Sequence, residues 1–176
     1  MGVLDDEDAV LRYAEQISPT QIEKHYTPPA LASFLVGLVP IHPNDRIIDP
    51  AAGRAQPFLR SFPATRRTHC EIDEGSDFLA TTLSYEWAIT NPPYHLLWAF
   101  IDKASCEASK GFAFLINING VNSLTPRRLR LLQERRFHLR RLHVCQVKQW
   151  FGRYYFVVFS KRGGQCKLSW DLAPWQ

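Results

Sequence analysis

Short apolar runs alternate with helix-like segments along most of this chain, and that alternation constrains its fold more than any other feature. Strand-like runs are followed by segments with helical spacing of their apolar residues, which is typical of a mainly parallel sheet covered by helices. We therefore predict an α/β fold that ends in an antiparallel hairpin. Strands are expected at 46–48, 68–72, 87–90, 112–118, 142–150 and 154–160. Helices are expected at 3–17, 30–39, 59–62 and 96–109, and Gly111 is expected to end the helix at 96–109. A further helix is expected to begin at Pro126, with Thr125 as its N-cap.

At 176 residues the chain is expected to form one domain over 1–176, with no separate target-recognition domain. No apolar run reaches the roughly 18 residues that span a bilayer, and the N-terminus lacks a signal-peptide pattern, so we expect a cytoplasmic protein without membrane contact. The four scattered cysteines are expected to be buried free thiols in a reducing compartment. The six histidines show no metal-ligand spacing, so no metal is expected.

The positive charge of the chain is concentrated in one segment, 127–141. Without the seven arginines and the single Glu134 of this segment, the 21 basic and 17 acidic residues of the chain fall to 14 and 16. A local arginine cluster is typical of a nucleic-acid partner, although a solvated helix face gives the same pattern. The seven residues are Arg127, Arg128, Arg130, Arg135, Arg136, Arg140 and Arg141.

The stretch Asn91-Pro92-Pro93-Tyr94 directly follows a predicted strand. Two prolines fix the backbone and remove two N–H donors, so the turn is stiff and offers acceptors only. Acceptors beside an aromatic ring suit a planar group that carries an NH2, such as a nucleobase or a side-chain amide. An ordinary proline-rich turn remains the alternative.

Asp49, Glu71 and Asn91 each close or follow a predicted strand, so we expect them to meet at one edge of the sheet. Asp49 leads into a glycine turn that ends at Gly53 and allows a close backbone approach to a ligand. Glu71 is placed to accept hydrogen bonds from ribose hydroxyls. Two further motifs are Asp77-Phe78, which suits an adenine, and Tyr26-Thr27-Pro28-Pro29. Taken singly, each of these motifs has a simpler explanation as a helix cap, a turn or a core aromatic residue.

In this order, the motifs resemble those of the class I S-adenosylmethionine-dependent N6-adenine DNA methyltransferases, from about Tyr26 to Phe159. The resemblance is to a compact stand-alone form and implies a Rossmann-like, seven-stranded sheet. It also implies S-adenosylmethionine as the cofactor, with its methionine end at Thr27, Asp49 and Gly53, its ribose at Glu71 and its adenine at Asp77. The cofactor site implied in full comprises Tyr26, Thr27, Pro28, Asp49, Pro50, Ala51, Gly53, Glu71, Ile72, Asp77, Phe78 and Asn91.

The resemblance further implies that Asn91, Pro92, Pro93 and Tyr94 are the catalytic residues. The Asn91 side chain and the Pro92 carbonyl would accept hydrogen bonds from the target amine, and Tyr94 would stack on the base. The expected partner is nucleic acid, with DNA preferred and RNA also compatible. The residues assigned to nucleic acid are Tyr94, Arg127, Arg128, Arg135, Arg136 and, as a second wall of the base pocket, Phe151.

The glycine turn departs from the family pattern because Ala55 stands where a second glycine is expected. A left-handed backbone costs a non-glycine residue about 1 kcal/mol or more, so a different loop or a low cofactor affinity is expected. Target specificity would come from 95–110, the arginine segment, a homo-oligomer or a partner. Methylation of RNA adenine, methylation of a protein glutamine amide, and a degenerate methylase that only binds nucleic acid stay open as alternatives.

Overall fold

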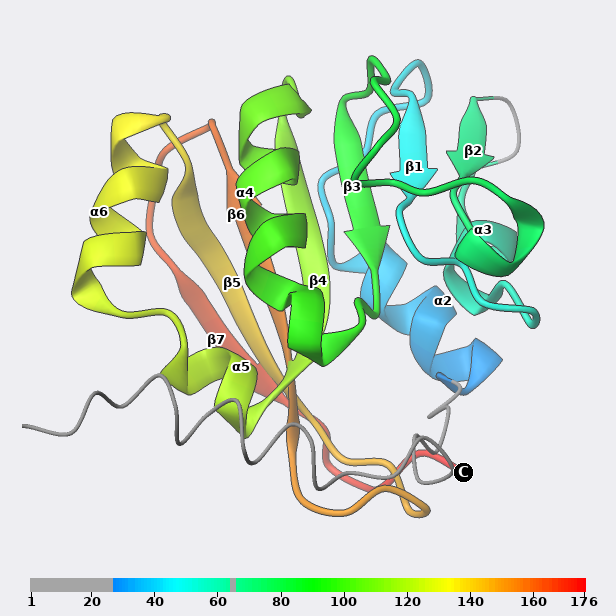
Figure 1. The fold of residues 1–176 in the computed structure, drawn as a ribbon. Helices are drawn as coiled ribbons and strands as arrows, with labels where there is room; N and C mark the ends of the chain where they lie inside the picture. The colour runs from blue at the N-terminus through cyan, green and yellow to red at the C-terminus, as the bar shows by residue number, and fades with distance from the viewer. Residues whose placement is uncertain (1–26, 64–65) are drawn as a thin grey trace, which may run out of the picture.

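The computed structural model describes residues 27–63 and 66–176, so the helix predicted at 3–17 and Tyr26 lie outside the described residues. Its centre is a seven-stranded sheet in the order β2-β1-β3-β4-β6-β5-β7 (Figure 1). The strands are β1 Ile47–Asp49, β2 Arg67–His69, β3 Trp87–Thr90, β4 Gly111–Asn117, β5 His138–Cys145, β6 Tyr154–Ser160 and β7 Lys167–Trp170.

The predicted mainly parallel sheet with an antiparallel hairpin is confirmed. Strands β2, β1, β3 and β4 run parallel, and β6 lies antiparallel between β4 and β5. Strand β7 then adds parallel to β5 and forms one edge of the sheet. The sequence did not predict β7, because its apolar side chains Leu168 and Trp170 are 62% and 61% exposed and leave no buried run to detect.

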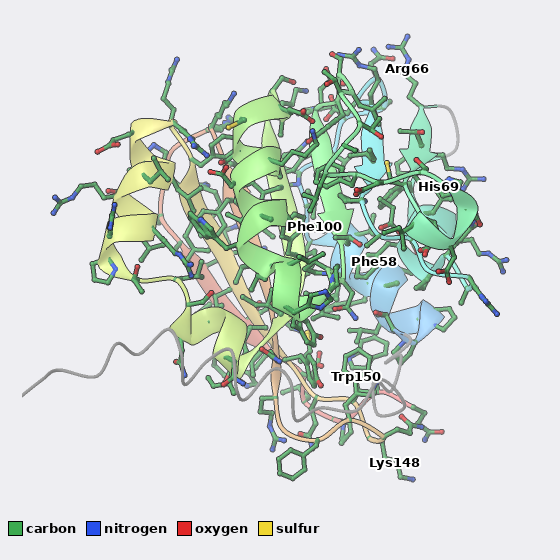
Figure 2. All side chains as sticks on the ribbon, in the orientation of Figure 1. Phe58, Arg66, His69, Phe100, Lys148 and Trp150 are labelled. Carbon is green, nitrogen blue, oxygen red and sulfur yellow. The ribbon has the colours of Figure 1, made fainter. Side chains whose placement is uncertain are left out.

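Helices cover both faces of the sheet and enclose two apolar cores. Helices α2 (Pro29–Gly37) and α3 (Pro57–Ser61) pack on one face, where Phe58 lies among buried side chains. Helices α4 (Leu97–Glu107) and α6 (Pro126–Glu134) pack on the other face, where Phe100 belongs to the second core. Short helix α5 (Ile118–Asn122) follows β4 directly. Phe58 and Phe100, which are labelled in Figure 2, belong to one core each.

Several predicted boundaries are wrong. The strand expected at 68–72 ends at His69, and residues Ile72–Glu74 form the 3-10 helix η2 with Ile72 70% exposed. The helix expected at 96–109 ends at Glu107, behind the 3-10 turn η3 (Tyr94–Leu96). Gly111 does not close it but begins β4, where a side chain would overlap the indole of Trp87.

The arginine segment divides between a helix and a strand. Thr125 caps α6 as predicted, by accepting a hydrogen bond from the backbone N–H of Arg128. The helix ends at Glu134, and the next strand starts at His138 rather than near 142. Arg140 and Arg141 therefore lie in β5, at an irregularity of its pairing with β6.

All four cysteines are free, as predicted. Cys70 and Cys145 are buried, but the prediction of burial is wrong for Cys106 and Cys166, which are exposed. Within the described ranges, no helix combines the length and the apolar character needed to cross a membrane.

The segment after β7 pairs with the loop that connects β5 to β6. Lys148 donates its backbone N–H to the Trp175 carbonyl and Trp175 donates its own to the Gln146 carbonyl, both at 2.8 Å. The Trp175 ring lies 5.5 Å from that of Phe34 on α2. The C-terminal residues thus join the hairpin to a helix on one face of the sheet.

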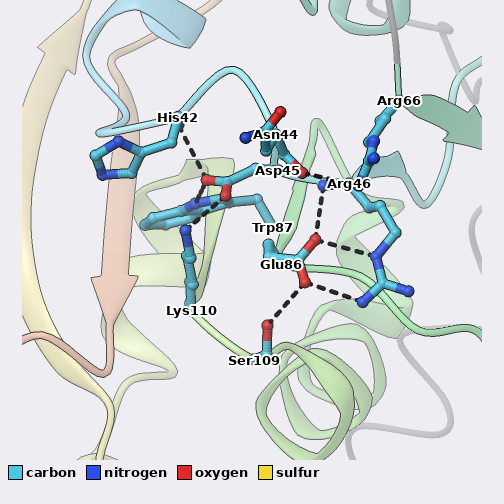
Figure 3. A network of polar contacts seen from close by, with 9 residues as sticks. All are labelled: His42, Asn44, Asp45, Arg46, Arg66, Glu86, Trp87, Ser109 and Lys110. Atoms are coloured by element: carbon cyan, nitrogen blue, oxygen red, sulfur yellow. Dashed lines mark hydrogen bonds and ion pairs between the residues drawn. The ribbon is translucent and has the colours of Figure 1, made fainter.

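The amino ends of the parallel strands are closed by a polar network (Figure 3). Buried Asp45 accepts hydrogen bonds from the Lys110 Nζ at 2.5 Å, the His42 backbone N–H at 3.0 Å and the Trp87 Nε1–H at 3.2 Å. Beside it, the two carboxylate oxygens of Glu86 accept from the Arg46 guanidinium, and this hydrogen-bonded pair lowers the pKa of Glu86 to about 2. The network joins the starts of β1, β3 and β4.

Candidate active site

A cleft of about 760 Å³ lies at the opposite, carboxyl ends of the strands. Its walls come from the segments that follow β1, β2 and β3, as expected for an open α/β sheet. Most of the residues predicted from the sequence are brought together here: Thr27, Pro50, Ala51, Gly53, Glu71, Ile72, Asp77, Phe78, Asn91, Pro92, Pro93 and Tyr94. Asp49 lies beneath the cleft floor, fully buried, and Pro28 precedes α2 as its N-cap.

The glycine turn is held against the end of β2 by a carboxylate. Glu71 accepts a hydrogen bond from the Gly53 N–H at 2.6 Å, and Gly53 has the positive φ of 63° that the tight turn needs. The left-handed non-glycine residue is Gln56, with φ 51°, whereas Ala55 has no positive φ. The left-handed position thus falls one residue after Ala55, at the N-cap of α3, which agrees with the expectation of a different loop.

Asp49 combines complete burial with an incomplete set of partners. Its Oδ1 accepts from the Ala51 N–H at 3.3 Å, and its buried Oδ2 has no hydrogen-bond partner among the described residues. Burial raises the pKa of Asp49 from 3.8 to about 7, against the opposing effect of hydrogen bonding from Thr90 and Ala51. A carboxylate in this state gains from any cationic or hydrogen-bond-donating ligand that reaches it.

Asp77 and Phe78 occupy different environments although they are neighbours. Asp77 is exposed, and its Oδ1 accepts from the Leu79 N–H at 2.8 Å. Phe78 is 2% exposed, and its ring lies 5.2 Å from that of Phe100. Phe78 is therefore a core residue whose surface also contributes to the cleft wall.

The Asn91 amide is fixed at both ends. Its Nδ2 donates to the Thr27 hydroxyl at 3.3 Å, and its Oδ1 accepts from the Tyr94 hydroxyl at 3.1 Å. Tyr94 is half-buried, and its ring lies 6.3 Å from that of Tyr154; burial raises the pKa of the Tyr94 hydroxyl well above its ordinary value. The hydroxyl is therefore a neutral donor at physiological pH.

Two aromatic side chains of the cleft were not predicted as site residues. Phe58 is the second residue of α3 and Phe100 lies in the first turns of α4, and both line the cleft (Figure 2). The apolar face of the helix predicted at 96–109 already contained Phe100. Nothing in the sequence showed that this face ends at a ligand cleft, because that depends on where β3 and α4 meet.

The residues assigned to nucleic acid do not form one surface. Arg135 donates to the Asp102 carboxylate at 2.7 Å and to the Ser105 hydroxyl at 2.6 Å, so it packs α6 against α4. Arg127 and Arg136 are exposed, and Phe151 is 98% exposed and outside the lining of the cleft. Arg128 lines a second, smaller hollow that adjoins the cleft at Tyr94.

A cluster of metal-ligand types also occurs in the described part of the chain, at His143, Cys145 and Asp171. Both ring nitrogens of His143 already have partners at 2.9 Å, Ser169 Oγ and Asp171 Oδ1. The cluster joins β7 to β5 through these bonds, so we assign it a structural role.

No protein-family model matches the chain, and no curated protein matches it by sequence. Solved structures do match its fold. A protein from Listeria monocytogenes described as a class I S-adenosylmethionine-dependent methyltransferase superposes with a TM-score of 0.61 at 13% identity, over 93% of this chain and 70% of that one. The chain has the class I methyltransferase fold.

Two further structures share this fold. A protein from Pyrococcus horikoshii described as an RNA methyltransferase matches with a TM-score of 0.60 at 15% identity, over 90% of this chain and 97% of that one. The M protein of the type I restriction enzyme EcoKI matches with a TM-score of 0.55 at 15% identity, over 91% of this chain and 52% of that one. At these identities the likeness concerns the fold of the chain.

Proposed function

We propose that this chain transfers a methyl group from S-adenosylmethionine to the exocyclic N6 amine of adenine in DNA. The observation that carries the proposal is one cleft in which the acceptor turn Asn91–Tyr94 faces the acidic and glycine segments around Glu71, Asp77 and Gly53. The strand-end acids suit the hydroxyl and amine donors of a nucleoside cofactor, and the turn suits a planar amine.

The residues present fit S-adenosylmethionine. A volume of about 760 Å³ lies within the roughly 300–1,000 Å³ of small-molecule sites. Glu71 would accept from the ribose hydroxyls, Asp77 from the adenine amine, and the unpartnered Oδ2 of Asp49 from the ammonium end. When bound, the cofactor supplies a methyl group activated by its positively charged sulfur.

Asn91 would act on the target amine as a fixed acceptor. The amine of adenine is a weak nucleophile because its lone pair is delocalised into the ring. Hydrogen bonds to Asn91 Oδ1 and the Pro92 carbonyl would favour the tetrahedral form of the amine and stabilise the positive charge that develops on it. Thr27 and Tyr94 hold the Asn91 amide in one orientation, which preorganises this acceptor.

Flipping a base out of a duplex costs a few kcal/mol, and stacking on Tyr94 would return about 1–3 kcal/mol. Phosphate contacts must therefore supply most of the affinity, and we assign these to Arg127, Arg128 and Arg136, with Arg135 contributing through its long-range charge. We further propose that the chain acts as a single catalytic domain in the cytoplasm, with a second copy or a partner completing its specificity. RNA adenine is the second candidate target, supported by the likeness to the RNA methyltransferase fold.

The test is transfer of tritiated methyl from the cofactor to DNA, RNA and protein, followed by mapping of the methylated base. Asn91→Ala is expected to lower transfer at least about 100-fold while the affinity for S-adenosylhomocysteine stays within about threefold. Asn44→Ala, at the other end of the sheet, is the matched control and should leave both unchanged.

Three results would contradict the proposal in different ways. Label found only in protein would replace the target by a side-chain amide. Transfer that survives Asn91→Ala would remove the acceptor mechanism. Failure of the wild-type chain to bind S-adenosylhomocysteine at millimolar concentration would favour a nucleic-acid-binding protein without activity.

A further inference from the structure

A second hollow, of about 350 Å³, adjoins the cleft and shares Tyr94 and His95 with it. We call it the flanking pocket. It lies where the start of α4 meets α5 and the first turn of α6, which are neighbours in Figure 1. The pocket is lined by Tyr94, His95, Leu97, Trp98, Asn117, Asn119, Gly120, Ser123 and Arg128.

Arg128 is held rigidly in the wall of this pocket. Its guanidinium lies 4.5 Å from the centre of the Trp98 ring, and its Nη1 donates to the Ser123 carbonyl at 2.9 Å. Among the described residues, Arg128 donates hydrogen bonds from its Nη1 only. Its Nε and Nη2 donors are therefore left for a ligand. An arginine fixed in this way binds an anion without losing further side-chain freedom.

The flanking pocket and the cleft differ in charge. Glu71, Asp73 and Asp77 line the cleft and outnumber its one arginine, Arg54, whereas no acidic side chain is among the described residues that line the flanking pocket. An anionic group such as a phosphate is therefore favoured in the pocket by Arg128 and opposed in the cleft by three carboxylates.

Two amides give the pocket its remaining polar character. Asn117 caps α5, its Oδ1 accepting from the Gly120 N–H at 2.9 Å, which makes it part of the frame. Asn119 is exposed on α5 and offers both a donor and an acceptor, the pair that reads a nucleobase edge. A volume near the lower limit of about 300 Å³ for ligand sites suits one nucleotide rather than a longer segment.

We propose that the flanking pocket binds the nucleotide next to the target base, with its phosphate on Arg128 and its base edge on Asn119. The shared wall at Tyr94 and His95 puts this nucleotide beside the base that enters the cleft. The proposal rests on the proposed function and deepens it, because it gives this short chain a means to select the sequence around its target.

The experiment measures methylation of oligonucleotides in which the positions next to one adenine are randomised. Wild type is expected to prefer one base at one adjoining position. Asn119→Ala should reduce that preference at least about fivefold, through a fall in kcat/KM on the preferred sequence and little change on the others. Arg128→Gln should raise KM about tenfold on every sequence, because it removes a phosphate contact.

Arg130→Gln is the matched control: it removes the same charge from the same helix, but Arg130 is exposed and outside the pocket lining. It should change KM less than about threefold. Since Arg128 also packs α6 on α4, Arg128→Lys and a thermal melt accompany Arg128→Gln. The lysine variant should keep its fold and recover part of the affinity.

A preference that persists in Asn119→Ala, or equal KM values for Arg128→Gln and Arg130→Gln, would overturn the flanking pocket while leaving the methyltransferase proposal intact. Wild type that binds S-adenosylhomocysteine but methylates no nucleic acid would overturn both.

Discussion

Asp45 and Asp49 lie four residues apart at the two ends of β1, both almost completely buried, and their pKa values shift in opposite directions. Burial raises the pKa of each carboxyl. At Asp45 the hydrogen bonds and positive charge of Lys110, with His42 and Trp87, outweigh burial and the pKa falls below its ordinary value. At Asp49 burial prevails, and the pKa rises to about 7.

The difference separates a structural end of the sheet from the end where we propose the active site. The amino end satisfies its buried carboxylate with protein donors, so it needs no ligand. The carboxyl end leaves the Oδ2 of Asp49 without a described partner, next to Pro50 and Ala51 of the cleft lining. The folded chain keeps this unfavourable arrangement, which a bound ligand would relieve.

The largest expected effect is at Gly111, in the structural end. Gly111→Ala would place a methyl group against the Trp87 indole and the Phe159 carbonyl, neither of which has room to move. We expect a loss of about 3 kcal/mol or more in unfolding free energy, measured by urea denaturation. Gly37→Ala, where a methyl group meets nothing within 4 Å, is the control. Similar midpoints for the two variants would show that the amino end is not tightly packed.

Asp45→Ala is expected to cost about 2–3 kcal/mol at pH 7, because it leaves the Lys110 and Trp87 donors without their acceptor. Asp45 has a lowered pKa when folded, so its stabilisation is present above the unfolded value of 3.8 and is lost as the pH falls below it. The deficit of the variant should therefore shrink in acid. A deficit of constant size from pH 7 to pH 3 would argue that Asp45 acts through packing rather than charge.

Asp49→Asn should show the opposite dependence on pH. Between about pH 4 and pH 7 folded Asp49 holds a proton that the unfolded chain has lost, so wild-type stability declines as the pH rises through this window. The variant should lose this decline, which amounts to about 1.4 kcal/mol per pH unit, so its stability relative to wild type should rise between pH 5 and pH 7. Denaturant unfolding at pH 5 and pH 8 measures this change in unfolding free energy. Asp77→Asn, at an exposed position, is the control and should show the same change with pH as wild type.

Asp49→Asn should also weaken S-adenosylhomocysteine binding about tenfold at pH 8, because a neutral amide does not attract the positively charged ammonium group of the ligand. If the variant gains stability but keeps its affinity for S-adenosylhomocysteine, Asp49 does not contact the ligand.

Gln56→Gly should have the smallest effect, below about 0.5 kcal/mol. Relief of the left-handed backbone at φ 51° is offset by the greater freedom of glycine in the unfolded chain. Thermal unfolding beside Gly111→Ala would then show that the cleft end tolerates a backbone change that the structural end does not. A stabilisation of several kcal/mol would instead indicate stored strain in the turn.

The sequence predicted the parallel sheet, the hairpin and the strand-end residues because each has a local sequence pattern: an apolar run, a proline pair or a polar residue at a strand terminus. It missed β7, whose four residues are held by pairing with β5 and by the His143–Asp171 contact rather than by an apolar face. It could not divide the arginines by role, since Arg135 and Arg136 are adjacent in sequence and only the fold gives Arg135 the Asp102 carboxylate.

The pairing of residues 146–148 with Trp175 has a consequence for how a large substrate reaches the cleft. Two main-chain hydrogen bonds and the contact with Phe34 brace the hairpin beside Tyr154, so opening on that side requires breaking all of them together. The turn η3 and helix α5 instead carry exposed side chains, namely His95, Leu96, Ile118 and Asn119. For the proposed nucleic-acid substrate, we therefore expect the η3 side of the molecule to yield before the side braced by Trp175.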